Sequence, residues 1–441
     1  MRGRQTTVVA VGLVVATLLA VPALASADTF RVTQTSDRAG ACDTRCALRE
    51  AVIAANDRVG EDTIRLPRGR YELTIAGIAE DSAAQGDLDV RAPSEKLTLI
   101  GAGARRTIID ANRIDRVFNV IGFPNTRFAV RGVTITGGRG QMSYEGAGLE
   151  LEGGTTTTLT GTKVAGNTTA ADTSYDGAGI VVDSGATLTI KRGILKRNST
   201  PTGDGGAIAS QGDLTLLKTT VAGNRAGNDG AGISHGGTSL TIRDSTISGN
   251  RAGTDPTSGD SDGAGIYFTG GLASITNSTI SGNTGPHPSG DGAGIYVAST
   301  TAIDILNTTI AFNEAGDSGG GIYVVGSAAA DLTNTVIARN RAPASPGSEN
   351  CAGTAPLSGG HNLENGTSCA LAGAGDLNAN PKLGRLADNG GPTRTHALRR
   401  TSAAINRGAD AQCPARDQRG VRRPQGRRCD IGAFELERRR R

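Results

Sequence analysis

Asp262-Gly263-Ala264-Gly265-Ile266-Tyr267 leads through Ile275 to Ser278-Thr279-Ile280-Ser281-Gly282-Asn283, and then the same phrase begins again. The second copy starts at Asp291-Gly292-Ala293-Gly294-Ile295-Tyr296 and closes at Thr308-Thr309-Ile310-Ala311-Phe312-Asn313. Related phrases run from Val130 to Asn340. Self-similarity of this kind is the signature of a solenoid, in which each repeat buries its apolar face only by stacking on its neighbours. The sequence therefore predicts stacked coils over this region.

The asparagine that closes each phrase, or the residue that substitutes for it, serves as a register mark for the repeats. The mark falls at Gly138, Asn167, Asn198, Asn224, Asn250, Asn283, Asn313 and Asn340. Eight positions earlier stand Val130, Leu159, Ile190, Leu216, Ile242, Ile275, Ile305 and Leu332, and three positions earlier stand Ile135, Val164, Leu195, Val221, Ile247, Ile280, Ile310 and Ile337. Both columns are wholly aliphatic, and alternation around them indicates short strands with one buried face.

The odd offset between the two aliphatic columns requires a turn between them. Six positions before the mark, Asp244, Asn277, Asn307 and Asn334 supply residue types that tolerate left-handed backbone geometry. A third strand is expected at each Gly-x-Gly-Ile phrase, with an inward aliphatic residue at Leu149, Ile180, Ile208, Ile233, Ile266, Ile295 and Ile322. Three short strands per coil predict an all-β, right-handed parallel β-helix. This solenoid resembles that of pectate-lyase-like proteins. A β-propeller needs longer units, and helical repeats need fewer Gly and β-branched residues.

The N-terminal residues have the pattern of an export signal. The whole chain has 441 residues and a formal net charge of +4. Arg2 and Arg4 precede an apolar run from Val8 to Val21, and Ala25-Ser26-Ala27 provides an A-x-A cleavage site. A membrane-spanning helix is the alternative, but the apolar run is shorter than the ~20 residues that a span needs. The sequence predicts a mature chain that starts near Asp28, carries no transmembrane segment and is secreted or held at the cell surface.

All six cysteines lie in the predicted exported part and flank the repeats. In an oxidising compartment, disulfides are expected rather than metal ligation. Pairing of neighbours joins Cys42 with Cys46, Cys351 with Cys369 and Cys413 with Cys429, although six cysteines allow 15 connectivities. A zinc site is disfavoured because His361 and His396 lack finger-like spacing to the cysteines.

A short amphipathic helix is predicted between Cys46 and Asn56, where Leu48, Val52 and Ala55 follow helical spacing. Cys46-Ala47-Leu48-Arg49-Glu50-Ala51, with Gly86-Asp87-Leu88-Asp89 and Gly101-Ala102-Gly103 further on, resembles the CSLREA domain at the start of exported bacterial β-helix proteins. Ala47 stands where that motif has serine. The resemblance implies a β-helix architecture and export, and it implies no particular chemistry.

The C-terminal part carries a second resemblance. Leu386-Ala387-Asp388-Asn389-Gly390-Gly391-Pro392, Asp417-Gln418-Arg419-Gly420 and Cys429-Asp430-Ile431-Gly432-Ala433-Phe434-Glu435 are similar to the choice-of-anchor Q domain, which commonly closes such repeats. Only Leu436-Glu437 and four arginines are seen after it, so neither an apolar anchor nor a wall-sorting motif is expected there. The expected organisation is a signal peptide (1–27), a CSLREA-like cap with first coils (28–110), β-helix repeats (111–341), a disulfide-bearing closing segment (342–437) and an Arg tail (438–441).

The candidate binding surface is the outward column just after the inward aliphatic residue. It reads Glu150, Val181, Ala209, Ser234, Tyr267, Tyr296 and Tyr323. Three adjacent coils therefore expose tyrosine, and a rigid row of rings is suited to sugar or protein contacts. The competing interpretation is that the rings pack beneath a long loop, such as 255–261 or 286–290.

A second column places aspartates directly before the Gly of each phrase, at Asp176, Asp204, Asp229, Asp262 and Asp291. Stacked carboxylates repel unless each binds a backbone amide or a shared cation. Turn capping is favoured over calcium, for which only Asp255, Asp260 and Asp262 cluster densely enough to begin a site. No other cofactor is expected.

No residues are assigned a catalytic role from the sequence. We expect a noncatalytic surface for adhesion or glycan binding on a monomer whose partner is a polysaccharide or a cell-surface polymer; nucleic acid is not expected for an exported chain without aromatic-basic interleaving. One alternative is a polysaccharide lyase or glycoside hydrolase, with Lys191, Lys218 and Arg243 as basic candidates on the outer face. Another is a structural surface spacer.

Overall fold

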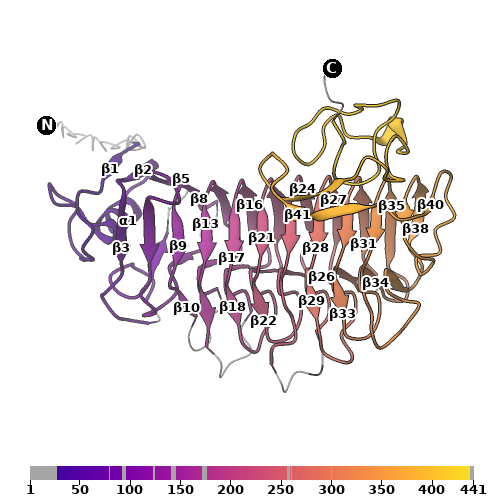
Figure 1. Ribbon diagram of the computed structural model, residues 1–441. Coiled ribbons are helices and arrows are strands. Elements are labelled where there is room, and N and C mark those ends of the chain that lie inside the picture. Colours follow the sequence, from indigo (N-terminus) through magenta and orange to yellow (C-terminus); the bar gives the residue numbers. More distant parts are fainter. Residues whose placement is uncertain are drawn as a thin grey trace, which may run out of the picture.

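The computed structural model describes residues 27–78, 80–91, 96–122, 125–140, 146–170, 176–255, 259, 261–298 and 300–437. Over these residues the chain winds into a right-handed parallel β-helix, drawn as a rod in Figure 1. The predicted signal peptide and the Arg tail lie outside the described residues, apart from Ala27. Among the described residues, no helix is both long enough and apolar enough to cross a membrane.

Three parallel sheets run along the rod, and each coil contributes one short strand to each sheet. Sheet A contains β1 (Thr29–Arg31), β2 (Glu61–Leu66), β5 (Lys96–Gly101), β8 (Arg127–Arg131), β12 (Thr156–Thr160), β16 (Thr187–Lys191), β20 (Asp213–Leu217), β24 (Ser239–Arg243), β27 (Leu272–Thr276), β31 (Ala302–Leu306), β35 (Ala329–Thr333) and β38 (Leu357–Gly360). Sheet B contains β3 (Gly69–Glu72), β6 (Thr107–Asp110), β9 (Thr134–Thr136), β13 (Lys163–Ala165), β17 (Ile194–Lys196), β21 (Thr220–Ala222), β25 (Thr246–Ser248), β28 (Thr279–Ser281), β32 (Thr309–Ala311), β36 (Val336–Ala338), β39 (Leu363–Glu364) and β40 (Leu377–Asn378).

Sheet C is built from the Gly-x-Gly-Ile phrases and completes each coil. It contains β4 (Leu88–Val90), β7 (Phe118–Val120), β11 (Leu149–Leu151), β15 (Ile180–Val182), β19 (Ile208–Ser210), β23 (Ile233–His235), β26 (Ile266–Phe268), β30 (Ile295–Val297), β34 (Ile322–Val324) and β37 (Cys351–Gly353). A short fourth ladder, which the sequence reasoning did not predict, lies directly after the register-mark residues. It contains β10 (Arg139–Gly140), β14 (Thr168–Thr169), β18 (Ser199–Thr200) and β22 (Arg225–Ala226), with β29 (Thr284–Gly285) paired to β33 (Glu314–Ala315).

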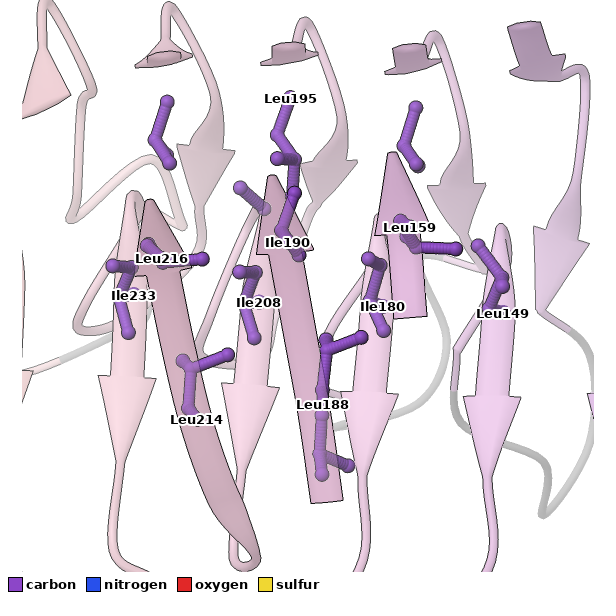
Figure 2. Packing of buried hydrophobic residues seen from close by; sticks show 14 of the residues in the cluster. Leu149, Leu159, Ile180, Leu188, Ile190, Leu195, Ile208, Leu214, Leu216 and Ile233 are labelled. Carbon is purple, nitrogen blue, oxygen red and sulfur yellow. The ribbon is translucent and has the colours of Figure 1, made fainter. Parts of the chain in front are cut away.

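The predicted aliphatic columns form one continuous core between the three sheets. Figure 2 shows Leu159 and Ile190 of sheet A, Leu195 of sheet B and Ile180 of sheet C in this cluster. Their side chains are fully or almost fully buried, as are the other members of the three columns. Because a one-residue slip would turn every such side chain outward, the aliphatic columns fix the register of the parallel ladders.

The turn between sheets A and B has the predicted left-handed geometry. The backbone φ angle is 53° at Asp244, 49° at Asn277, 45° at Asn307 and 50° at Asn334. Lys218 adopts the same geometry at 53°, although lysine is not a residue type that favours it. The stacked coils therefore impose the turn, and the local side chain only eases it.

The register-mark asparagines form a buried ladder that spans successive coils. Each side-chain amide Nδ2 donates to the Oδ1 of the next asparagine over 2.9–3.1 Å, from Asn167 through Asn340 to Asn350. Each Nδ2 also donates to a backbone carbonyl of the preceding coil, as Asn283 does to Ile247 over 3.2 Å. The asparagine at the register mark therefore also joins neighbouring coils by hydrogen bonds.

The N-terminal end of the rod is covered by helix α1 (Leu48–Asn56), as predicted, which packs on β1, β2 and β4. Leu48, Ala51 and Val52 are buried against the first coils. The Glu50 carboxylate accepts the backbone N–H of Ala47 over 2.8 Å, which satisfies one donor at the start of the helix.

Arg49 of the same helix is fully buried and is held by the surrounding loops. Its guanidinium donates to the Asp37 carboxylate over 2.7 and 3.2 Å and to the carbonyl oxygens of Ala83, Asp87 and Gly86 over 2.8–2.9 Å. The Asp37 carboxylate also accepts the N–H groups of Thr74 and Ile75. Arg49 therefore ties two separate connections, β1–α1 and β3–β4, to the capping helix.

The three disulfides join Cys42 to Cys46, Cys351 to Cys369 and Cys413 to Cys429, which is the neighbour pairing that the sequence predicts. The first lies beside α1, and the second lies at the far end of the rod, where β37 to β40 continue the coils. The third lies in the C-terminal segment described next.

From β41 (Leu383–Ala387) onward the chain does not close the end of the rod but turns back along its side. Figure 1 shows this segment, coloured gold, above the C-terminal half of the coils. β41 pairs antiparallel with β42 (Thr395–Leu398), and a 3₁₀ helix follows at Asp410–Gln412. The segment covers the outer face of sheet B, where it buries Ala311, Val336 and Ala338 with Leu398 and Phe434. Small apolar side chains on that outer face explain why the segment lies there.

Polar contacts fix the position of this segment on the coils. The Gln418 side chain donates to the Ser245 carbonyl oxygen over 3.1 Å and to the Thr246 hydroxyl over 2.9 Å, and it accepts the Thr279 hydroxyl over 2.6 Å. Within the segment, the Asp417 carboxylate binds the Arg419 guanidinium and the N–H groups of Arg419, Val421 and Glu435. The motif residues Asp417, Gln418 and Arg419 thus serve folding and docking.

His235 points into the core from β23, where it stacks on Phe268 with ring centroids 5.9 Å apart. Burial lowers its pKa from 6.5 to about 4. The unfolded chain therefore binds this proton between pH 6.5 and 4 while the folded chain does not, so His235 lowers stability as the pH falls through that window.

Replacing His235 by Leu should remove this penalty. The free energy of unfolding of H235L minus that of the wild type should rise by about 3 kcal/mol between pH 7.5 and pH 4, because the shift is about 2.5 units at 1.36 kcal/mol each. Urea unfolding of both proteins at the two pH values measures this change. Taking the difference between the two proteins cancels the contribution of the other titrating groups. A difference independent of pH would contradict the buried neutral imidazole.

Candidate functional site

The outer face of sheet C brings together the two side-chain columns singled out in the sequence. Tyr267 lies on β26, Tyr296 on β30 and Tyr323 on β34, and the three residues are direct neighbours in the parallel register. The aspartate column precedes two of these strands, β26 and β30, at the turn that enters sheet C. The sheet thus holds a row of phenol rings beside a row of carboxylates.

The three tyrosine rings pack on one another along the rod. The ring centroids of Tyr267 and Tyr296 are 5.1 Å apart, and those of Tyr296 and Tyr323 are 5.5 Å apart with an interplanar angle of 7°. All three side chains are half-buried. Because each ring covers part of its neighbour's face, the row offers ring edges, hydroxyl groups and its two end faces to a ligand, rather than three open stacking platforms.

The residues that flank the tyrosine row in the same column are small. Ser234 precedes Tyr267 in the column, and Ala352 follows Tyr323. Both are small, so each terminal ring stands above a smaller residue. The tyrosine column therefore forms a raised ridge over three coils.

The aspartate column is a ladder of carboxylates that bind backbone amides. The Oδ1 atoms of Asp176, Asp204, Asp229, Asp262 and Asp291 each accept the backbone N–H of the equivalent residue in the next coil, over 2.7–3.0 Å. The last donor in the ladder is Ser318. These bonds agree with the turn-capping interpretation of the column.

The carboxylate ladder acts electrostatically on the tyrosine row. Burial raises the pKa of Tyr267, and the charges of Asp229, Tyr296 and Asp262 raise it further. Burial also raises the pKa of Tyr323, with contributions from Asp291 and Asp262. The two phenols therefore stay protonated at neutral pH and keep their O–H donors.

Two of the three residues of the predicted calcium set, Asp255 and Asp262, lie in the described part of the chain. Asp262 belongs to the carboxylate ladder, and the Asp255 backbone N–H donates to Gly227 O over 3.2 Å. Asp260 lies outside the described residues. Among the described residues, no group of three or more His, Cys, Asp or Glu side chains is placed to hold a metal ion.

The basic residues proposed for a lyase lie on another edge of the rod. Lys191 and Arg243 end strands β16 and β24 of sheet A, and Lys218 occupies the left-handed turn that follows β20. All three are exposed. The aspartate column lies at the turn into sheet C instead, so the structure does not bring these basic residues together with it.

Sequence reasoning missed a charged cluster at the N-terminal end of the same sheet C face. Arg116 forms ion pairs with Asp87 and Glu150, and Asp89 lies fully buried in the same column as Glu150. Burial raises the pKa of Asp87 and of Asp89. Asp87 and Asp89 belong to the Gly86–Asp89 motif, whose acidic residues were visible in the sequence but whose partner Arg116 was not.

The comparisons with known proteins agree with this architecture. Residues 100–310 match the family described as the right handed beta helix region. The chain is a right-handed parallel β-helix, and among solved structures it is similar to pectate lyase Pel9A, with a TM-score of 0.52 and 16% sequence identity over 93% of this chain and 98% of the other. A likeness at that identity defines the fold and not the activity. No curated protein matches the sequence.

Proposed function

We propose that this protein is an exported β-helix that presents the outer face of sheet C for adhesion or glycan binding. The observation that carries the proposal is the ridge of Tyr267, Tyr296 and Tyr323 beside the carboxylate ladder. Sugars offer hydroxyl groups together with apolar C–H faces, and a site of phenol hydroxyl groups and ring edges matches both.

Export and surface location rest on the N-terminal sequence and on the two resemblances. The leader with its Ala25-Ser26-Ala27 site favours cleavage before Asp28. The CSLREA-like residues form the buried contacts of the capping helix, and the choice-of-anchor Q-like residues hold the C-terminal segment on sheet B. These contacts give both sets of motif residues a structural role in the folded chain. Mass spectrometry of protein recovered from the culture medium should find Asp28 at the N-terminus.

Replacing all three tyrosines by Ala should weaken the affinity for the glycan at least tenfold. The variant should then no longer be retained on a glycan column. The variant loses the phenol hydroxyls and the ring edges together. A panel of acidic and neutral polysaccharides, with and without calcium, identifies the retaining glycan. New chain ends in the same panel would instead indicate a lyase or hydrolase, and neither retention nor cleavage would favour the spacer alternative.

Two controls separate binding from folding in this test. The triple Tyr→Phe variant keeps the ring stack and removes only the hydroxyls, so it should fold as the wild type does and bind more weakly. Leu272→Ala, at an exposed site on sheet A, should leave retention unchanged. Unchanged retention of the folded triple Ala variant would rule out the tyrosine ridge as the binding site.

A further inference from the structure

The outer face of sheet B and the β41–β42 hairpin enclose a cleft of about 510 Å³, on a different side of the rod from the tyrosine ridge. The coil side contributes Ser281, Phe312 and Arg339, and the hairpin contributes Arg385, Leu386 and His396. The cleft therefore exists only because the C-terminal segment lies back on the coils. Neither the repeats nor the segment would form it alone.

Two arginines give this cleft a positive charge. Arg339 and Arg385 are both exposed, and among the described residues neither guanidinium lies within ion-pair distance of a carboxylate. The Arg339 guanidinium lies over the Phe312 ring, 5.8 Å from its centroid. Two unpaired guanidinium groups on opposite walls favour an anionic ligand, because their planar forks match a carboxylate.

Two of the residues that line the cleft on the coil side occupy backbone positions that favour glycine. The residue before the register mark has a positive φ in successive coils, and it is glycine at Gly166, Gly223, Gly249 and Gly282. In the next two coils the position holds Phe312, with φ of 62°, and Arg339, with φ of 58°. A bulky side chain in left-handed geometry is strained, and such residues concentrate at functional sites.

Strain alone does not mark the site, since Arg197 occupies the same column at φ of 56° outside the cleft. What distinguishes Phe312 and Arg339 is that both side chains line an open cleft opposite a second arginine. Arg197 instead provides a matched control: an exposed arginine with the same backbone geometry and no hairpin above it.

The floor of the cleft is a hydrogen-bonded pair that positions the hairpin. The Ser281 hydroxyl lies 2.8 Å from His396 Nε2, and His396 Nδ1 lies 2.8 Å from the carbonyl oxygen of Gly384. Nδ1 must carry the proton to bond a carbonyl, so Nε2 accepts from Ser281. Burial lowers the pKa of His396, which keeps the ring neutral at neutral pH. The positive charge of the cleft thus comes from the arginines.

We propose that this cleft binds a carboxylate ligand that carries an apolar or ring-shaped body. The carboxylate lies between Arg339 and Arg385, and the body lies against Phe312 and Leu386. This site is independent of the glycan-binding ridge, because it lies on sheet B and uses none of the ridge residues. Loss of one site by mutation therefore leaves the other intact.

The test uses 4-fluorobenzoate as a probe, observed by fluorine NMR with the full mature chain. Titration with the wild type should broaden the probe signal in a saturable way. The double variant Arg339→Gln with Arg385→Gln should weaken the dissociation constant at least tenfold, because both charges lie on exposed side chains whose loss leaves the fold unchanged. Arg197→Gln should bind as the wild type does.

Further probes and one further variant test whether the charge and the apolar wall both contribute to binding. The neutral probe 4-fluorobenzyl alcohol should bind at least tenfold more weakly than 4-fluorobenzoate, and inorganic phosphate should compete poorly because it lacks the apolar body. Phe312→Gly should also lose the probe while it relieves the left-handed strain. Absence of saturable broadening, equal binding of the neutral probe, or wild-type binding by the double arginine variant would overturn the proposal.

Discussion

Replacing Arg49 by Met should lower the free energy of unfolding by about 4 kcal/mol, as is typical when one partner of a buried ion pair is removed. The change leaves the buried Asp37 carboxylate without its guanidinium, and three loop carbonyl oxygens lose their donor. Urea unfolding followed by circular dichroism measures the loss. Arg49→Lys should recover only part of it, since an ammonium group cannot reproduce the five-bond fork.

Arg45→Met is the matched control for this prediction, because Arg45 precedes the same helix but is exposed. It should change stability by less than about 0.5 kcal/mol. The R49M defect should also appear first at the N-terminal end, as faster proteolysis between Asp37 and Asp87. Stability of R49M within about 1 kcal/mol of the wild type would show that the capping helix does not depend on this arginine.

Replacing Asn283 by Asp should destabilise the coils by roughly 4 kcal/mol at neutral pH, with almost no change in side-chain volume. Asn283 donates Nδ2 to Asn313 Oδ1 and Ile247 O, and its Oδ1 accepts two N–H groups of Asn250. A carboxylate keeps the acceptor and loses the donor. It then faces two oxygen atoms in a fully buried site, which is costly without a compensating partner.

Asn378→Asp, at an exposed asparagine on β40, is the control for the added charge and should be nearly neutral. The Asn283→Asp defect should shrink as the pH falls, because a protonated carboxyl group can again donate. A stable Asn283→Asp protein at neutral pH would show that the asparagine ladder marks register without holding the coils together.

The fold was predictable because each coil repeats the same short sequence pattern. Aliphatic residues at fixed offsets from the asparagine identified two of the strands, and the Gly-x-Gly-Ile phrase identified the third. Asp244, Asn277 and Asn307 identified the left-handed turn. The neighbour pairing of the cysteines followed from their positions outside the repeats. The short fourth ladder was missed because its two-residue strands carry no alternation that a pattern can detect.

The candidate sites were predictable only in part. Register alone placed Tyr267, Tyr296 and Tyr323 in one outward row, but it did not reveal that the rings stack on one another. The column position of the aspartates was visible, while their bonds to the next coil's amides required the three-dimensional turn. Arg116 with Asp87, and Ser281 with His396, come from segments whose proximity no sequence spacing encodes.

The sequence by itself determined the parallel β-helix, its register and its outward columns, because a solenoid is built from contacts between neighbouring repeats of the same pattern. The tertiary structure decided where the C-terminal segment lies. That segment follows no repeat, so its position depends on long-range contacts such as Gln418 with Thr246 and Phe434 over the outer face of sheet B. The cleft between Arg339 and Arg385 is a product of that docking, which is why only the folded chain displays it.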